Sequence, residues 1–494
     1  MRVPEDFVAY LEEALGGPGA AVALEALGSP ASVSVRLNPF KTAAPGRMPA
    51  WADGLRERVP WSRHGFMLES RPVFTLDPCF HAGAYYVQDS SSMFVGEAFR
   101  KMIAQKFPDG APDGRPVRVL DLCAAPGGKT TDLAASLREM FGGRFVLVAN
   151  EVVRQRAAAL ADNLAVWGDP NVMTLSADPA VFAQLGGHFD AIVADVPCSG
   201  EGMFRKDGSA AEQWSRETVE LCRMRQRRIV ADVWPALAEG GIMIYSTCTF
   251  NRLENDLNVG WIMEELGACT PADAGYVPVR PSAGAGVPDG DGVIASEFGH
   301  CLVRGFVRGE GQYCAAIVKT APAEESRVAF RPAGAAAAER GRPSKGRGAG
   351  RGSGSGSVPE GLFVPGTELR ERGGRLVALP CGAAAEMESV ASVLHPFRAG
   401  CIAGEMKGGD FVPSADLALS LLLGAEAFPR AELSEREALA FLHRDTICLS
   451  DAPKGYVLVC YASLPLGFVK NIGPRCNNLH PQGRRIRMDI NRQI

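Results

Sequence analysis

The chain has 494 residues, more than one hydrophobic core normally organises, so we expect two to four domains. A hydrophobic share of 46% and a charged share of 22% are ordinary for a soluble globular protein, and a net charge of −4 excludes a polycation that binds nucleic acid over its whole surface. No stretch offers the ~18 consecutive apolar residues of a membrane span, and the acidic N-terminal segment is unlike a signal peptide.

The number and spacing of the cysteines indicate their redox state and whether they could bind a metal. The 13 cysteines are an odd number without framework spacing, which favours free thiols in a reducing, cytoplasmic compartment. The sequence contains no C-x-x-C pair, so we expect no metal site. No coiled-coil heptad is present, which favours a monomer.

Residues 1–115 predict a small α+β module. Residues 4–15 have the spacing of an amphipathic helix, and residues 32–41 alternate like a strand before a turn at Asn38-Pro39. Residues 84–99 predict a loop capped by Asp89 or Ser90 and then a helix.

Residues 116–320 alternate strand and helix patterns, which is typical of βαβ units around a parallel sheet and places this part in the α/β class. A late apolar run at residues 311–319 predicts an antiparallel edge strand. The predicted strands span residues 117–122, 145–149, 171–176, 190–195 and 241–246. The predicted helices span residues 129–140, 153–167, 215–238 and 254–266.

The remaining chain changes character twice. Residues 321–358 are rich in Gly, Ser and Ala with scattered cations, which predicts a flexible basic linker; a solvated tether and an RNA-tracking segment are both open. Residues 359–494 predict a small β-rich domain with a basic tail, a combination that suits RNA. Its predicted strands span residues 375–379, 446–449, 456–461 and 466–469, and its predicted helices span 414–423 and 434–443.

Polar residues follow apolar strands at several points of the α/β region. The turn C-A-A-P-G-G-K at residues 123–129 joins a strand to a helix, and Gly127 and Gly128 allow a tight reversal there. Asp195 ends a later strand. Because ligands bind at the carboxyl ends of parallel strands, these groups predict one shared site. The turn matches neither the G-x-G-x-x-G nor the P-loop spacing.

Two acids extend this site. Glu151 follows the second predicted strand, where a ribose diol is usually bound, and Asp178 follows the third and is placed to accept from an adenine amino group. An acid at a strand end is often only a helix cap, but together with the glycine turn these two predict an adenosine-containing ligand.

Cys198 and Cys248 also follow strand ends. Buried cysteines are usually structural, but two thiols at the ligand-binding edge of a sheet predict covalent catalysis or a disulfide couple. The redox alternative is the weaker one, because it predicts a C-x-x-C motif or a redox cofactor site.

The motifs D-L-C-A-A-P-G-G-K-T, A-D-V-P-C-S-G-E-G and Y-S-T-C-T-F resemble the Sun-type (Nol/Nop/Sun) family of S-adenosylmethionine-dependent RNA cytosine carbon-5 methyltransferases. Four further motifs extend the resemblance: R-L-N-P, Y-Y-V-Q-D-S-S-S, N-E and E-G-M-F-R-K-D. The tail P-L-G-F-V-K-N-I-G-P-R is similar to bacterial RsmF-type ribosomal RNA enzymes. The loop Q-D-S-S-S and the segment before residue 313 depart from the family pattern.

The resemblance implies a class I methyltransferase domain at residues 116–320, with a mostly parallel seven-stranded sheet and a reversed last strand, between RNA-binding modules at 1–115 and 359–494, the latter PUA-like. It implies S-adenosylmethionine as the cofactor and, as the substrate, a cytosine in 16S ribosomal RNA, either as free RNA or in the small ribosomal subunit. The implied cofactor residues are Cys123, Ala124, Ala125, Pro126, Gly127, Gly128, Lys129, Glu151, Asp178 and Asp195.

By the same resemblance, Cys248 is the nucleophile, Cys198 releases the product and Asp195 lies between cofactor and base. A thiolate that adds to carbon 6 makes carbon 5 nucleophilic, and the target base must be unstacked to reach it. The residues expected to contact RNA are Arg36, Arg205, Lys206, Lys470 and Arg485. Transfer RNA as substrate, and a non-catalytic ribosome-assembly factor, remain as alternatives.

Overall fold

The computed structural model describes residues 3–43, 48, 51–52, 55, 57–206, 208–280, 284, 286–323, 326 and 358–490. The predicted linker at 321–358 falls outside the described residues except for 321–323, 326 and 358. Within the described part of the chain, no helix combines the length and the apolar character needed to cross a membrane.

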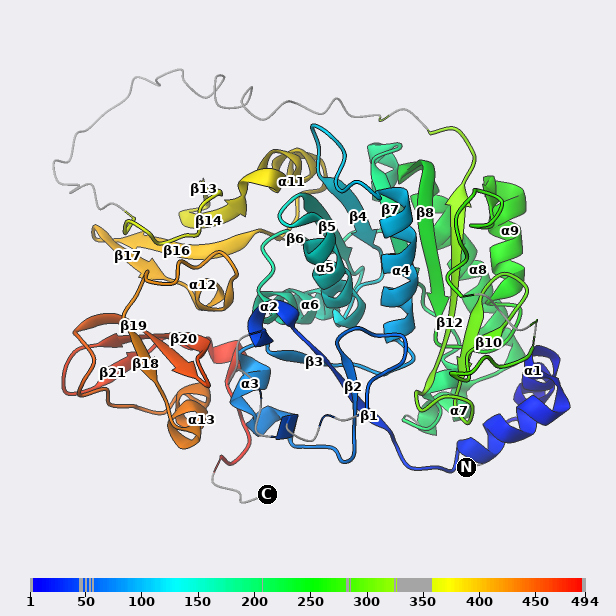
Figure 1. Ribbon diagram of the computed structural model, residues 1–494, viewed down its shortest axis with the longest axis horizontal. Helices are drawn as coiled ribbons and strands as arrows, with labels where there is room; N and C mark the ends of the chain where they lie inside the picture. Colours follow the sequence, from blue (N-terminus) through cyan, green and yellow to red (C-terminus); the bar gives the residue numbers. More distant parts are fainter. Residues whose placement is uncertain are drawn as a thin grey trace.

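A large mixed sheet organises the molecule (Figure 1). Seven of its strands follow the order β11-β12-β8-β7-β4-β5-β6, and β10 and β15 extend its two ends. All neighbours from β8 to β6 are parallel, whereas β12 runs antiparallel to β8. The strands are β4 (Val117–Asp121), β5 (Phe145–Asn150), β6 (Val172–Leu175), β7 (Phe189–Asp195), β8 (Leu237–Thr247), β9 (Ala268–Cys269), β10 (Ile294–Ala295), β11 (His300–Val303), β12 (Gly311–Lys319) and β15 (Arg398–Ala399).

The expected seven-stranded, mostly parallel sheet with a reversed last strand is therefore confirmed. The edge position predicted for residues 311–319 is wrong, because β11 and β10 continue the sheet beyond β12. All of β12 is buried accordingly.

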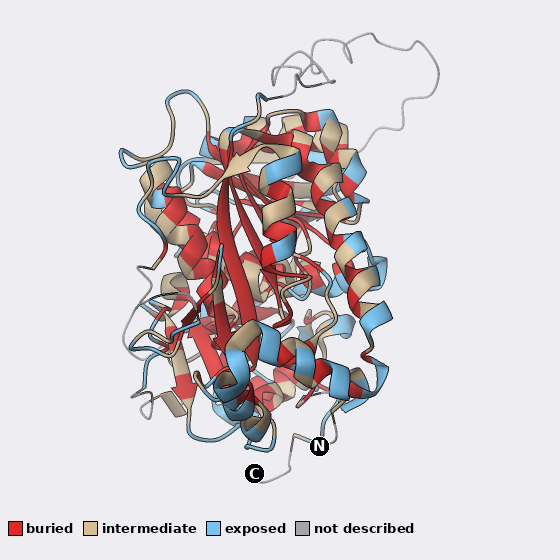
Figure 2. Cartoon of the chain, turned by 90° about the vertical axis from the view of Figure 1, so that its right-hand side faces the viewer, coloured by how far each residue is buried: buried red, intermediate tan, exposed pale blue. Residues whose placement is uncertain are grey.

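Helices cover both faces of this sheet, because side chains alternate between the faces along each strand. On one face, Val119 and Ile244 pack against α4 (Met93–Lys106), α5 (Gly128–Phe141) and α6 (Arg154–Trp167). On the other, Leu120 and Tyr245 pack against η3 (Pro179–Leu185), α8 (Arg216–Val233) and α9 (Asp256–Leu266). Figure 2 shows the buried strands between helices whose outer surfaces are exposed.

The N-terminal module has a three-stranded antiparallel sheet in the order β2-β1-β3. Its first helix, α1, leaves helical geometry at Gly16, whose φ is 74°, one residue after the predicted end at 15. The Asn38 side chain caps the turn that follows β1 by accepting from the Phe40 amide at 3.2 Å. The elements are α1 (Glu5–Ala26), β1 (Val33–Leu37), α2 (Pro39–Thr42), β2 (Gly65–Leu68), η2 (Phe74–Leu76), α3 (Pro78–His81) and β3 (Tyr85–Val87).

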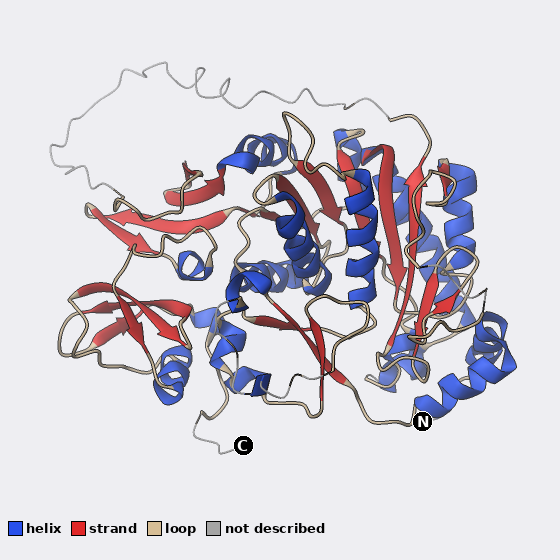
Figure 3. Ribbon diagram, in the orientation of Figure 1, coloured by secondary structure: helices blue, strands red, loops and turns tan. Residues whose placement is uncertain are grey.

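The C-terminal part contains two four-stranded sheets (Figure 3). The strand predicted at 446–449 is wrong, since these residues form no regular element. The first sheet holds β13 (Thr367–Arg372), β14 (Arg375–Pro380), β16 (Cys401–Lys407) and β17 (Asp410–Pro413), with α11 (Cys381–Leu394) and α12 (Ala415–Leu419). The second holds β18 (Arg430–Glu432), β19 (Gly455–Tyr461), β20 (Leu464–Asn471) and β21 (Cys476–Asn478), with α13 (Glu435–His443) and η6 (Gln482–Arg484).

The two ends of the chain share one hydrophobic core. Val35 and Tyr85 of the N-terminal sheet belong to the same buried cluster as Phe441, Val459 and Leu464 of the C-terminal part. Figure 1 shows α3 beside α13 and β20 accordingly. Ion pairs add to this arrangement: the Arg484 guanidinium lies 2.9 Å from both Asp162 on α6 and Asp416 on α12.

Candidate active site

The turn between β4 and α5 is fixed by its neighbours. Gly127 has a φ of 112°, and a Cβ there would lie 3.1 Å from Leu160 Cδ1, so only glycine fits without strain. The Pro126 carbonyl accepts from Tyr86 Oη at 3.0 Å and from Asn163 Nδ2 at 2.8 Å. The Ala125–Pro126 peptide bond is cis. The turn therefore presents the amides at the start of α5 in a set position.

Asp121 lies at the end of β4 and is fully buried. Its Oδ2 accepts from Thr130 Oγ1 at 2.6 Å, whereas Oδ1 has no hydrogen-bond partner among the described residues. Burial raises the pKa of this carboxyl to about 7. A buried oxygen without a partner, next to a turn that admits no added Cβ, is the pattern expected where a polar ligand completes the site.

Glu151 and Asp178 stand at the carboxyl ends of β5 and β6, as predicted. Glu151 Oε1 accepts from the Val153 amide at 2.9 Å, and its other oxygen lies 3.2 Å from Arg156. Asp178 caps η3 by accepting from the Ala180 amide at 3.1 Å. Asp178 thus serves as a helix cap, whereas Glu151 binds the backbone just before α6. Glu151 is nearly buried and fixed, whereas the Asp178 side chain is half exposed.

Asp195, at the end of β7, is the centre of a polar network. Its Oδ2 lies 2.9 Å from Lys129 Nζ, and its Oδ1 accepts from Ser246 Oγ at 2.7 Å and from Gln312 Nε2 at 3.1 Å. Lys129 also donates to Ser92 Oγ at 2.8 Å. Burial alone favours the neutral amine, but Asp195 outweighs it and the pKa of Lys129 is raised. The carboxylate is therefore held in one orientation by side chains from α5, β8 and β12.

The two cysteines meet beside this network. The sulfur atoms of Cys198 and Cys248 are 3.1 Å apart, and the Cys248 amide donates to Cys198 Sγ at 3.3 Å. The hydrogen bond with Cys248, burial and nearby carboxylates raise the pKa of the Cys198 thiol well above its usual range. Cys198 therefore keeps its proton at neutral pH, and either sulfur can be the donor in the contact between the two thiols.

A buried set of polar side chains holds the two cysteine loops, and the sequence interpretation missed it. Glu254 Oε2 accepts from the Ser199 amide at 3.0 Å and from Gln226 Nε2 at 2.7 Å. Glu201 Oε2 accepts from the amides of Phe250 at 2.7 Å and Asn251 at 3.0 Å. One carboxylate therefore fixes the backbone after Cys198 and the other fixes the backbone after Cys248.

Gln312 was missed as well, although one signal was available. It is a polar residue inside a strand that is buried along its whole length, and its Nε2 also donates to the Thr247 carbonyl at 2.9 Å. Such a residue needs partners, which here are the Asp195 carboxylate and the backbone of β8.

The cations expected to contact RNA lie in very different surroundings. Arg36 is fully buried: its guanidinium donates to Gln88 Oε1 at 2.9 Å and lies 4.8 Å from the centre of the Trp167 ring. Its predicted contact with RNA is wrong, because these groups enclose it inside the protein. Lys470 is half-buried over the Tyr456 ring at 5.2 Å, and the Arg485 Nε is buried without a partner among the described residues.

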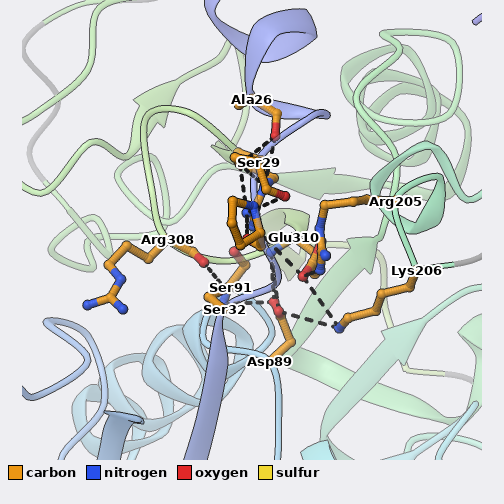
Figure 4. Close-up of polar contacts among 11 residues, drawn as sticks. Ala26, Ser29, Ser32, Asp89, Ser91, Arg205, Lys206, Arg308 and Glu310 are labelled. Carbon is orange, nitrogen blue, oxygen red and sulfur yellow. Dashed lines mark hydrogen bonds and ion pairs between the residues drawn. The ribbon is translucent and has the colours of Figure 1, made fainter. Parts of the chain in front are cut away.

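Arg205 and Lys206 follow the Cys198 loop and are already ion-paired (Figure 4). Arg205 Nε lies 2.8 Å from Glu310 Oε2, and this pair is buried. Lys206 is more exposed and lies 3.7 Å from Asp89 Oδ2. The Glu310 amide donates to Asp89 as well, so these side chains join the loop after β7 to the start of β12 and to the loop before α4.

Comparison with known proteins decides the family. A family model described as 16S rRNA methyltransferase RsmB/F matches residues 112–269. Models of the RsmF N-terminal domain and the RsmF PUA domain match residues 3–90 and 428–486. Ribosomal RNA small subunit methyltransferase F of Enterobacter sp. (strain 638) is 30% identical and covers 97% of this chain and 95% of its own length. The chain belongs to the RsmB/F methyltransferase family.

Other relatives agree. The RsmF protein of Salmonella schwarzengrund (strain CVM19633) is 32% identical over 86% of this chain and 84% of its own length. The crystal structure of PH0851 superposes on this chain with a TM-score of 0.52, which shows a shared fold. The two sequences are 19% identical, and the match covers 64% of this chain and 66% of the PH0851 chain. The resemblance found in the sequence is confirmed, and the protein is an enzyme of the RsmB/F methyltransferase family with an RsmF-type PUA domain.

Proposed function

We propose that this enzyme methylates carbon 5 of a cytosine in small-subunit (16S) ribosomal RNA through a covalent bond between Cys248 and the base. The observation that carries the proposal is the pair of thiols 3.1 Å apart beside Asp195, at the carboxyl ends of β7 and β8. Membership of the RsmB/F family supports ribosomal RNA as the substrate.

The residues at this edge fit S-adenosylmethionine. Residues 123–129 and the unpartnered Asp121 oxygen suit its polar end, Glu151 would hold the ribose and Asp178 the adenine. When bound there, S-adenosylmethionine supplies an electrophilic methyl group on sulfur.

The protein's own residues activate the base. The Cys248 thiolate forms a bond to carbon 6 of cytosine, and the electron pair of the 5,6 double bond makes carbon 5 nucleophilic. The negative charge that develops on the ring is stabilised by the Lys129 ammonium, which Asp195 holds in place at 2.9 Å. Ser246 and Gln312 fix the Asp195 carboxylate, and Ser92 accepts from Lys129.

Release of the product needs a base. After methylation, carbon 5 must lose its proton so that the electron pair re-forms the double bond and Cys248 leaves as the thiolate. Cys198 is our candidate, since its sulfur lies next to Cys248. Once the Cys248 sulfur is bonded to carbon 6, its hydrogen bond with Cys198 is lost, and with it the largest cause of the raised pKa. Cys198 can then release its proton to solvent, and its thiolate accepts the proton from carbon 5.

The test uses RNA from cells that lack this protein, incubated with methyl-labelled S-adenosylmethionine and either the purified protein or Cys248→Ala. We expect the wild type to place 5-methylcytosine at a defined cytosine of 16S ribosomal RNA or of isolated small subunits, mapped by bisulfite sequencing. Cys248→Ala should lose at least about 10³-fold in rate while binding the cofactor normally. Label confined to transfer RNA would overturn the substrate, and activity of Cys248→Ala would overturn the nucleophile.

A further inference from the structure

A cavity of about 440 Å³ opens where three parts of the chain meet, away from the cysteines. We call it the junction cavity. Its walls come from α3 and β3 of the N-terminal module, from α6 and from the C-terminal part between α12 and η6. Its volume lies within the range of about 300–1,000 Å³ that is usual for small-molecule sites.

Flat rings make up much of its lining. Phe80, Tyr86 and Trp167 all line the cavity. The Arg36 guanidinium stacks on Trp167 at 4.8 Å, which fixes this ring, and the Tyr86 hydroxyl is fixed by its bond to Pro126. Rigid aromatic side chains are the surfaces on which nucleobases stack.

Two residues of this lining each carry a buried polar atom without a partner in the described part of the chain. His480 is only 5% exposed, and its Nε2 has no hydrogen-bond partner among the described residues. One terminal nitrogen of Arg484 is likewise buried and unpaired within the described chain. The other nitrogens of Arg484 are used by Asp162 and Asp416. Buried polar atoms without partners are costly, so these two indicate a ligand that offers hydrogen bonds.

The charged side chains that line the junction cavity do not favour an anionic ligand. Arg484 is already matched by two carboxylates, and Asp162 itself lines the cavity. Burial lowers the pKa of His480 to about 4, so its ring is neutral at physiological pH. The lining thus carries no surplus positive charge for a phosphate, whereas a neutral, planar, polar ring matches both the aromatic walls and the two free polar atoms.

We propose that the junction cavity binds one unpaired nucleobase of the RNA substrate, distinct from the target cytosine. The base stacks against the aromatic wall and exchanges hydrogen bonds with His480 Nε2 and Arg484. This inference rests on RNA being the substrate. It places a second recognition point behind the cofactor turn, because Tyr86 and Asn163 join the cavity wall to Pro126.

The test fills the cavity without removing a contact. Ala159 lines the cavity on the exposed side of α6, and Ala158 is its exposed neighbour outside the cavity. We expect Ala159→Trp to weaken binding of a methylatable 16S ribosomal RNA fragment about tenfold by fluorescence anisotropy, while Ala158→Trp binds like the wild type. Both variants should keep the wild-type melting temperature and affinity for S-adenosylmethionine.

A second measurement identifies the ligand as a base. Abasic sites placed one at a time along the fragment should include one position, other than the target, where wild-type binding falls about tenfold and binding by Ala159→Trp does not fall further. His480→Phe keeps the ring next to Phe441 and removes the nitrogen, so it should cost about fivefold at the same position.

Equal RNA affinities of Ala159→Trp and Ala158→Trp, or no abasic position coupled to Ala159→Trp, would overturn the junction cavity as a base site. Failure of the proposed function has a different signature. Wild-type protein would then bind the fragment without forming 5-methylcytosine, and the comparison of the two alanine variants would still decide the cavity.

Discussion

Asp195 and Lys129 depend on each other at the centre of the site. Asp195 was predicted from its place at the end of an apolar strand, where ligands bind in a parallel sheet, and Lys129 was predicted only through the family resemblance of the turn at residues 123–129. Their orientation was not predictable, since it is set by Ser92 and Gln312 from distant parts of the chain. Residue type and strand position predict which residues belong to a site. The side chains that orient those residues are brought in by tertiary packing, which the sequence does not show.

Glu254 should make stability depend on pH. Burial raises its pKa to about 7, although the Ser199 and Asn251 donors oppose this shift, whereas an unfolded glutamate titrates near 4.3. Between about pH 4.5 and 7 the folded state therefore keeps a proton that the unfolded state has lost, so the free energy of unfolding falls as pH rises through this window.

Glu254→Gln cannot titrate and should flatten this dependence, measured by urea unfolding at several pH values. Asp121 keeps a slope of the same sign in the variant, because its pKa is raised to about 7 as well. Glu265→Gln, exposed on α9, is the matched control and should follow the wild type. A Glu254→Gln curve parallel to the wild-type curve would contradict this account.

At the scale of elements, Glu310 joins the start of β12 to the loop after β7. It is 4% exposed and pairs with Arg205, and Arg304 lies 3.8 Å away. Glu310→Gln leaves these cations without their charge partner, so we expect the free energy of unfolding to drop by about 3 kcal/mol. Urea unfolding measures this drop.

Lys206→Ala provides the comparison within the same cluster. Its exposed pair with Asp89 should contribute under about 1 kcal/mol to stability, but its loss should weaken RNA binding. If Glu310→Gln unfolds like the wild type, or Lys206→Ala proves the more destabilising change, the roles assigned to these two loops are wrong.

The central elements were predictable because each carries its own pattern. The predicted strands and helices of residues 117–266 match β4 to β8 and α5, α6, α8 and α9 within a few residues, except at the end of α8 and the start of β8. There, Pro235 stops the helix at Val233, and the strand begins at Leu237. The strand prediction for residues 446–449 was wrong because a short apolar run does not reveal whether a partner strand lies beside it.

At the scale of the whole molecule, the close joining of the N- and C-terminal parts was not predictable. β15 is only two residues long and pairs with β6 across more than 200 residues of chain. The core shared by Tyr85 and Phe441 carries no local signal either. Each segment shows an apolar face in the sequence, but nothing in the sequence says which apolar faces meet.

Gly168 tests this joining. It ends α6 with a φ of 91°, and an added Cβ would lie 2.1 Å from the Leu419 carbonyl oxygen of α12. Gly200, just before η4 (Glu201–Met203), has the same left-handed backbone with a φ of 75°, and no atom lies within 4 Å of such a Cβ. Both changes to alanine cost about 1–2 kcal/mol for the left-handed backbone, and Gly168→Ala should cost clearly more because α12 must move. Equal losses in urea unfolding would contradict the close packing of α6 against α12.

The central claim is the covalent route, and Cys198→Ala tests it most directly. Without the base that releases the product, the variant should accumulate a protein–RNA adduct when given RNA and S-adenosylmethionine, visible as a slower band on a denaturing gel. The double variant Cys198→Ala/Cys248→Ala should form none, and Cys222→Ala, which removes a buried thiol outside the site, should turn over like the wild type. Full turnover by Cys198→Ala with no adduct would contradict the account.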